Sequence, residues 1–423
     1  MPHSVLAAPD QTRSTGPTRA EWMVLAAAFL GWMFDGVEQG VFPLVARPAL
    51  QDLLGVEADA LIGPWMGYIT ALFLVGAALG GLVFGWLGDR LGRVRSMVLS
   101  ILAYSLFTGC CYFAQAPWQL GAFRFLAAVG MGGEWSLGVA LVMECWPERH
   151  RPLLAGAIGA AANIGFGLLG ALGLAFEVSR GSWRWVMLAG AAPALLALFI
   201  IRYVPESDRW RKAVQQSHST TPFRDIFSRV LLGRTLLGLT FASVALIGTW
   251  GSVQWLPAWA DKLTAGEVHS AKGMTQLLMA GGAVIGCFVG PLIGGRMGRR
   301  PAYFLLCLAS LLACGYLFRY VNTYGGLFLL MTFLVGGFTA AFYGWLPLYL
   351  PELFPTRARA TGQGFCYNFG RILAAVGAVQ TGQLLKFYEG SYAQAGAVIT
   401  LVYALGLVVI WLGPETRGKP LPD

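Results

Sequence analysis

Charged side chains are scarce in this chain. Only 12% of its 423 residues are Asp, Glu, Lys or Arg, about half the share that is usual in a soluble domain, whereas 56% are hydrophobic. This balance indicates a membrane protein. Histidine is rarer still, because its four copies (His3, His150, His218 and His269) all lie in polar segments. Any proton carrier inside the membrane must therefore be a carboxylate.

Chemical motifs of enzymes and metal proteins are also missing. The seven Cys form no CxxC pair and lie in or beside apolar stretches, which excludes a disulfide framework and predicts no metal site. No HExxH helix, phosphate-binding loop or nucleophile with a base is found, so we expect neither an enzyme nor a cofactor. The start of the chain has no long apolar core, which excludes a cleaved signal peptide and predicts a disordered tail over residues 1–21.

Twelve apolar runs are present, and each is long enough to cross a hydrocarbon core of roughly 30 Å. They predict an all-α membrane protein with twelve transmembrane helices. The runs cover residues 22–46, 64–88, 96–115, 118–146, 152–177, 183–204, 235–260, 271–294, 302–320, 325–350, 360–386 and 391–413.

Basic residues divide unequally between the two sides of this arrangement. Twenty Lys and Arg fall in the segments on the side of both termini, and six fall on the other side, namely Arg47, Arg180, Lys262, Lys272, Arg319 and Lys386. The positive-inside rule then places both termini in the cytoplasm. The net charge of +9 is thus a topology signal, and we expect a lipid-embedded protein of the bacterial inner membrane with no nucleic-acid partner.

The longest polar connection, residues 205–234, divides the chain into two halves. It is basic and amphipathic, which predicts a cytoplasmic linker along the membrane surface. We therefore predict an N-terminal six-helix bundle over residues 22–204, a C-terminal bundle over residues 235–413 and a cytoplasmic tail over residues 414–423.

The two halves repeat the same two motifs. GWLGDRLGRVR (85–95) and PLIGGRMGRR (291–300) follow the second span of each half, and ECWPERHR (144–151) and ELFPTRAR (352–359) follow the fourth. The offsets are 206 residues from Arg90 to Arg296 and 208 residues from Glu144 to Glu352. A nearly constant offset indicates parallel repeats related by an axis along the membrane normal.

These motifs resemble those of the major facilitator superfamily over nearly the whole chain. The first loop has the family's residues Gly85, Asp89, Arg90, Gly92 and Arg93, and RFLAAVGMGGEW, PESDRW and PETRG (414–418) resemble marks of its sugar-porter-like branches. The resemblance implies a transporter of two pseudo-symmetric six-helix bundles that works by alternating access.

A narrower resemblance joins the chain to the sialate/lactate and aromatic-acid proton symporters. It is carried by DGVE in the first span and by LPLYLPELFPTRARATGQGFCYNFGRILAA (346–375). Two departures stand out. Glu38 stands where the aromatic-acid branch usually has Asp, and Gly295 stands at the place of Asp89 in the second copy of the loop.

The loop residues predict a cytoplasmic gate. Asp89 can accept hydrogen bonds from the N-terminus of a helix or pair with an Arg, and Arg93, Glu144 and Arg151 can join adjacent helices while this side is closed. We assign Gly85, Arg90, Gly92, Glu352 and Arg359 to the same gate from the motifs. The alternative is that these charges only determine topology.

Five charges lie well inside the predicted spans. Asp35 and Glu38 are three residues apart on one helix face, within reach of Arg124 if the helices adjoin. Two close carboxylates resist ionising together, which predicts a proton site. The alternatives are a permanent structural triad with Arg124 and a vestibule position for Glu38. Glu134 is either a second proton site or the resting partner of Arg371.

Arg371 is the candidate for anion recognition, because its planar guanidinium fits a carboxylate and stays charged. The resemblance also implies a substrate-binding Arg at this position. The alternative is a salt bridge to Glu134 or Asp35. Further candidates for the substrate site are Arg124, Gln39, Tyr68, Asn163, Trp250, Gln254, Tyr343, Trp345 and Asn368.

The leading hypothesis is a proton-coupled symporter for a small organic anion, such as a monocarboxylate, an aromatic acid or an acidic sugar. We expect a monomer that uses the proton gradient as its energy source. A proton-coupled exporter of amphipathic or cationic compounds and a neutral-sugar porter are the alternatives, and a membrane sensor without transport activity is disfavoured because no soluble domain is recognised.

Overall fold

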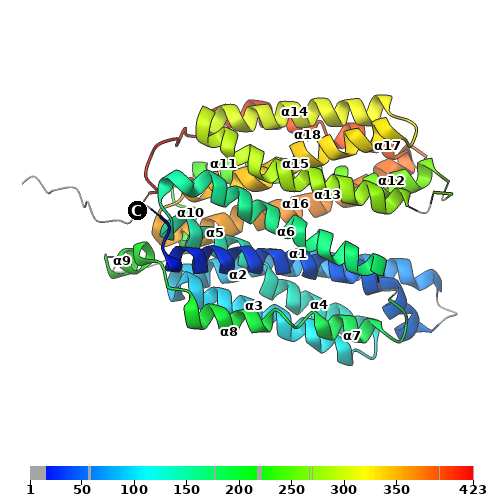
Figure 1. The fold of residues 1–423 in the computed structure, drawn as a ribbon, viewed down its shortest axis with the longest axis horizontal. Coiled ribbons are helices and arrows are strands. Elements are labelled where there is room, and N and C mark those ends of the chain that lie inside the picture. The colour runs from blue at the N-terminus through cyan, green and yellow to red at the C-terminus, as the bar shows by residue number, and fades with distance from the viewer. Residues whose placement is uncertain are drawn as a thin grey trace, which may run out of the picture.

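The computed structural model describes residues 16–55, 59–175, 178–216, 222–265, 267–268, 270–389 and 391–422. Throughout these ranges the regular structure is helical. Figure 1 shows two bundles of long, nearly parallel helices, with the linker helices α9 (Asp208–Gln216) and α10 (Pro222–Ile226) at the same end as the C-terminus. This end is the cytoplasmic side by the distribution of basic residues.

The first bundle contains helices α1 to α8. Their bounds are α1 Arg19–Leu54, α2 Asp59–Leu91, α3 Arg93–Cys110, α4 Pro117–Met131, α5 Glu134–Cys145, α6 Arg151–Ala175, α7 Trp183–Ala189 and α8 Ala194–Tyr203. The second contains α11 Leu232–Gly251, α12 Leu256–Leu263, α13 Ala271–Met297, α14 Arg299–Tyr320, α15 Gly326–Leu353, α16 Arg359–Phe387, α17 Tyr392–Ile399 and α18 Val402–Val409.

The twelve predicted spans are all present as helices. Within the described ranges, eleven helical segments are long and apolar enough to cross a membrane, and four of them consist of two consecutive helices (α4–α5, α7–α8, α11–α12 and α17–α18). The twelfth is α16, whose 29 residues span about 43 Å although its composition is more polar. The predicted twelve-helix, two-bundle fold is therefore confirmed.

The two bundles meet through α2 against α16 and through α6 against α13 and α15. Small residues allow close approach at both contacts. A side chain at Gly159 of α6 would collide with the carbonyl of Tyr343 in α15, and one at Gly85 of α2 would lie 2.9 Å from the carbonyl of Ala360 in α16. The predicted gate residue Gly85 therefore has a packing role between the halves.

A Pro-Glu-Ser/Thr sequence ends each bundle and caps a helix of the same bundle. Glu206 accepts hydrogen bonds from the backbone N–H groups of Arg93 (3.0 Å) and Val94 (3.1 Å) at the start of α3. Glu415 accepts from Arg299 (2.9 Å) and from the next residue (3.1 Å) at the start of α14. Both contacts satisfy N–H groups that have no partner within their helix.

Glycine permits the turn that precedes each of these helices. Gly92 and Gly298 both have φ of +105°, a backbone conformation that other residues rarely adopt. The predicted gate residue Gly92 thus shapes the chain between α2 and α3. The linker helix α9 is fixed beside this turn, because Trp210 Nε1 donates to the backbone oxygen of Asp89 (2.9 Å).

The two caps differ in their electrostatics. Burial raises the pKa of Glu415, but hydrogen bonds from backbone N–H groups outweigh burial and leave the pKa below its ordinary value. For Glu206, burial is the dominant effect and raises the pKa. Of these two carboxylates, therefore, Glu415 is the one whose stabilising effect is lost as the pH falls through its pKa in the folded protein.

We predict that Glu206→Ala and Glu415→Ala each reduce stability by about 1 kcal/mol, because each leaves two N–H groups of a helix start without their carboxylate acceptor. The measurement is thermal unfolding of the purified protein in detergent. Asp208→Ala is the control, since this exposed carboxylate contacts only Arg211 in the same helix turn (3.5 Å). Equal unfolding temperatures for all three variants would contradict the capping role.

Candidate functional site

A central cavity with about 900 Å³ of space not filled by protein atoms, part of it open at the mouth, lies between the two bundles. Its walls come from α1, α6, α11, α13, α15 and α16 and from the short turn after α11. The polar and aromatic lining residues are Trp32, Gln39, Asn163, Phe166, Thr249, Trp250, Gln254, Gln276, Thr339, Tyr343, Tyr367 and Arg371. Because both halves contribute, a molecule bound here contacts each of them.

Arg371 is buried at the boundary of this cavity and of a second one of about 410 Å³. Asn368, one turn earlier in α16, accepts a hydrogen bond from Arg371 Nη1 (3.0 Å). The guanidinium carbon lies 4.9 Å from the ring centre of Tyr367 and 5.7 Å from that of Trp32. These contacts orient the guanidinium without neutralising its charge.

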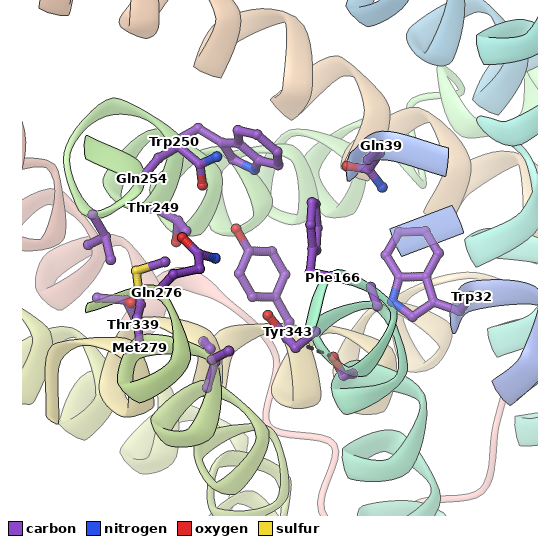
Figure 2. A pocket seen from close by; sticks show the side chains of 18 of the residues that line it. Trp32, Gln39, Phe166, Thr249, Trp250, Gln254, Gln276, Met279, Thr339 and Tyr343 are labelled. Atoms are coloured by element: carbon purple, nitrogen blue, oxygen red, sulfur yellow. Dashed lines mark hydrogen bonds between the residues drawn. The ribbon is translucent and has the colours of Figure 1, made fainter. Parts of the chain in front are cut away.

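The cavity has two chemically different sides, which Figure 2 shows to the left and right of Tyr343. Trp32, Gln39 and Phe166 lie on one side, together with the cation–π contact of Trp32 to Arg371. Thr249, Gln254, Gln276 and Thr339 lie on the other side and offer hydroxyl and amide groups. A ligand that fills the cavity meets a cation near one end and neutral hydrogen-bonding groups at the other.

Asp35 and Glu134 are buried, and none of their four carboxylate oxygens has a hydrogen-bond partner among the described residues. Glu134 packs against α1 at Gly31, one turn before Asp35, so the two carboxylates approach each other from α5 and α1. Arg371 also interacts electrostatically with Asp35. The salt bridge from Arg371 to Glu134 or Asp35, which was the alternative to anion recognition, is not formed in the described part of the chain, since neither carboxylate has a hydrogen-bond partner there.

Glu38 has a different environment from Asp35. It forms a buried ion pair with Arg124 Nη1 and accepts a hydrogen bond from Thr108 Oγ1 (2.8 Å). Arg124 also donates to the Glu38 backbone oxygen (3.2 Å) and lies 4.5 Å from the ring centre of Phe73. Glu38 and Arg124 are thus paired as the structural alternative describes, but Asp35 does not join them.

Three residues predicted at the substrate site lie outside the cavity. Arg124 is held by Glu38, and Trp345 is fully buried within the second bundle against Tyr303 (ring centres 4.6 Å apart). Tyr68 is 64% exposed and contacts Trp65 instead of lining the cavity. For Trp345 and Tyr68 the sequence could not show this, because an aromatic residue in an apolar helix gives no sign of which face it occupies.

The other predicted residues are near the cavity. Gln39, Gln254, Tyr343 and Arg371 line it, as do Asn163 and Trp250. Asn368 does not line it but positions Arg371, and its amide nitrogen donates to the backbone oxygens of Gly132 (3.1 Å) and Gly364 (3.0 Å).

Several lining residues were not predicted. They are Trp32, Phe166, Thr249, Gln276, Thr339 and Tyr367. Gln276 carried a usable signal, since an amide in a long apolar run is costly unless it faces a polar space. The threonines carried none, because their hydroxyls can bond within their own helix, as Thr339 does to Val335 (2.8 Å).

The cytoplasmic ends of the two bundles are joined by buried charges. Asp89 accepts from the backbone N–H groups of Ala360 (3.2 Å) and Thr361 (2.8 Å) at the start of α16, which is the predicted helix-terminus contact. Arg93 contacts Asp89 (2.6 Å) and Glu144 (2.9 Å), and Arg359 of the other bundle also contacts Glu144 (2.8 Å). The structure is thus closed on this side.

The other predicted gate residues lie around this network. Arg299 pairs with Glu352 (2.6 Å) in the second copy of the motif. Arg151 pairs with Glu148 (3.2 Å) and not with the first network, where Arg359 occupies the position expected for it. Arg90 stacks on Trp86, with 4.6 Å between the guanidinium carbon and the ring centre.

Comparison with known proteins gives a consistent result over almost the full length. A probable 4-methylmuconolactone transporter of Cupriavidus pinatubonensis is 33% identical over 398 residues, covering 93% of this chain and 90% of the relative. The gallate transporter of Pseudomonas putida is 30% identical over 413 residues, covering 88% and 87%.

Among solved structures, the proton:xylose symporter XylE bound to 6-bromo-6-deoxy-D-glucose has a TM-score of 0.80 at 17% identity, covering 95% of this chain and 98% of that one. At this identity the similarity concerns the fold. The sequence pattern of the Major Facilitator Superfamily matches residues 22–378. The chain therefore belongs to the Major Facilitator Superfamily and is an integral, multi-pass membrane transporter.

Proposed function

We propose that this protein is a proton-coupled symporter that carries a small organic anion by alternating access. The observation that carries the proposal is Arg371, a buried guanidinium at the central cavity whose hydrogen-bond partner is the neutral Asn368. Arg371 forms no ion pair within the described residues, and a buried cation without one is costly unless a ligand supplies the opposite charge. A carboxylate can accept two parallel hydrogen bonds from its planar fork.

The cavity walls favour a ligand with a flat apolar body. Trp32, Tyr367 and Phe166 provide aromatic surface near Arg371, and the amides and hydroxyls on the opposite side can bind neutral polar groups of the same ligand. The relatives named as carriers of 4-methylmuconolactone and gallate support an organic anion of this kind.

We assign proton coupling to Asp35 and Glu134 and a structural role to Glu38. Asp35 and Glu134 are buried, close to each other and without a partner, so a proton shared between them relieves their repulsion. Asp35 also interacts electrostatically with Arg371, which links proton binding to the anion site. With the acids protonated, Arg371 attracts the anion more strongly, and proton binding precedes substrate binding.

A neutral-sugar porter is the second candidate, because four amide side chains line the cavity. Gln39, Asn163, Gln254 and Gln276 all line it, and amides are typical ligands of sugar hydroxyls. The two candidates differ in their need for Arg371, since a neutral sugar has no charge for the guanidinium to bind.

We predict that Arg371→Ala weakens binding of gallate to the purified protein by at least about tenfold, because it removes a charge-assisted pair. Arg371→Lys keeps the charge but loses the planar fork, and we expect an intermediate affinity. The measurement is calorimetric titration in detergent with benzoate and xylose as further ligands. Unchanged anion binding in Arg371→Ala, with competition by xylose, would favour the sugar porter instead.

We predict that Asp35→Asn and Glu134→Gln abolish accumulation of the anion driven by a proton gradient in liposomes, while exchange of labelled for unlabelled anion continues. Removing either acid disrupts the shared proton site but leaves Arg371 in place. The proposal fails if both variants still accumulate the anion in response to the gradient.

Thermal unfolding of Glu38→Gln and Asp35→Asn separates a structural role from a role in proton coupling. Glu38→Gln should unfold at a lower temperature, because it leaves Arg124 buried without its counter-ion. Asp35→Asn should not, because the Asp35 carboxylate has no partner to lose. The opposite order of unfolding temperatures would assign the structural role to Asp35.

A further inference from the structure

The two copies of the cytoplasmic loop are not equally charged. In the first copy, Asp89 and Glu144 face Arg93 and Arg359, so two carboxylates balance two guanidinium groups. In the second copy, Gly295 replaces the residue equivalent to Asp89. Glu352 is the equivalent of Glu144 in this copy. It is already paired with Arg299 (2.6 Å) and accepts a hydrogen bond from Thr416 (2.5 Å).

Gly295 lies against the other bundle at the position that corresponds to Asp89 in the first copy. Asp89 lies against the start of α16, where it accepts from the N–H groups of Ala360 and Thr361. A Cβ at Gly295 would lie 2.8 Å from Pro152 Cγ, so this glycine lies against the start of α6 in the same manner. The repeat therefore places the start of α6 opposite a position that has no acid, although Pro152 has no N–H group to donate where Ala360 has one.

A cleft with about 610 Å³ of empty space is present at this position on the cytoplasmic side. Gly295 and Pro152 line it together with five cations and two carboxylates, namely Arg149, Arg151, Arg299, Arg417, Lys419, Glu148 and Glu352. The lining therefore has an excess of three positive charges, which favours a bound anion.

Arg151 provides an independent sign of a ligand. Its side chain is 3% exposed and lines the cleft, yet its buried Nε has no hydrogen-bond partner in the ranges that the structure describes. Its carboxylate contact is Glu148, whose side chain is 47% exposed, at 3.2 Å. A buried guanidinium with an unused donor beside an empty space is the arrangement that an oxyanion completes.

We propose that this cleft binds an oxyanion of the phosphate class, which takes the place of the carboxylate that Asp89 supplies in the first repeat. The ligand would contact Arg151 of the first bundle and the basic tail residues Arg417 and Lys419 of the second. It thereby holds the cytoplasmic ends of the two bundles together. Inorganic phosphate and the head group of an anionic phospholipid share this chemistry.

The test is thermal unfolding of the full-length protein in detergent, with inorganic phosphate added at constant ionic strength. We expect a saturable rise of roughly 3 °C in the wild type. Gly295→Asp should abolish the rise, because the introduced carboxylate occupies the site. Gly295→Ala introduces the same Cβ contact with Pro152 without charge and should keep the rise.

A second pair of variants tests the site without altering the glycine. Arg151→Gln should raise the phosphate concentration for the half-maximal shift by about tenfold, through loss of one charge-assisted contact. Arg95→Gln removes an exposed arginine of the first bundle and should have no effect. This pair decides the question if Gly295→Asp does not fold.

Nanodiscs separate the two sources of the anion. A phosphate response in phosphatidylcholine discs supports a soluble ligand, and a response only to phosphatidylglycerol supports a lipid head group, provided that Gly295→Asp and Arg151→Gln lose it. The proposal is overturned if neither anion shifts the wild type, or if the shift is the same in both variants as in the wild type.

Discussion

The cost of keeping a charge away from water governs the arrangement of this transporter. Arg124 and Glu38 meet this cost as an ion pair inside the first bundle, reinforced by Thr108. The cost is not offset in this way for three other charged residues. Arg371 contacts an amide and aromatic rings, and Asp35 and Glu134 have no hydrogen-bond partner among the described residues. Arg371 lines the cavity between the bundles and interacts electrostatically with Asp35, and in the proposed mechanism an anion and a proton complete these charges.

The same principle explains the closed cytoplasmic side. Buried carboxylates there contact guanidinium groups from both bundles and the N-terminus of α16, so closure is stabilised by contacts that separation of the bundles would expose to water. Water can solvate these groups on opening, which keeps the difference in free energy between the two states small. The network joins Asp89 and Glu144 to a single helix start, that of α16, and therefore acts at one point of the interface.

Much of this organisation could be predicted from the sequence. The twelve spans follow from hydropathy, and the repeats and the helix-terminus contact of Asp89 follow from the spacing of short motifs. The sequence also limited the candidates for the unpaired guanidinium to Arg124 and Arg371, since only these two lay deep in the spans. Which of them is neutralised depends on a long-range contact with Glu38, and sequence spacing does not reveal such a contact.

The lining of the cavity was harder to predict for a physical reason. Tyr343 and Trp345 are two residues apart in α15, and the first lines the cavity while the second is packed inside the bundle. In a membrane helix that is apolar all round, hydrophobic periodicity does not distinguish these faces. The closeness of Asp35 to Glu134 was not predicted either. Glu38 is the nearer acid in the sequence, whereas Glu134 packs against α1 one turn before Asp35.

One rigid element connects both ends of the mechanism. Helix α16 carries Arg359 and Thr361 at the closed cytoplasmic end and Asn368 and Arg371 at the cavity, about 18 Å away along a continuous helix. A tilt that draws the guanidinium toward a bound carboxylate must also move the helix start against Asp89. Substrate binding at Arg371 and opening of the cytoplasmic contact at Asp89 can therefore be coupled through the rigid helix α16 alone.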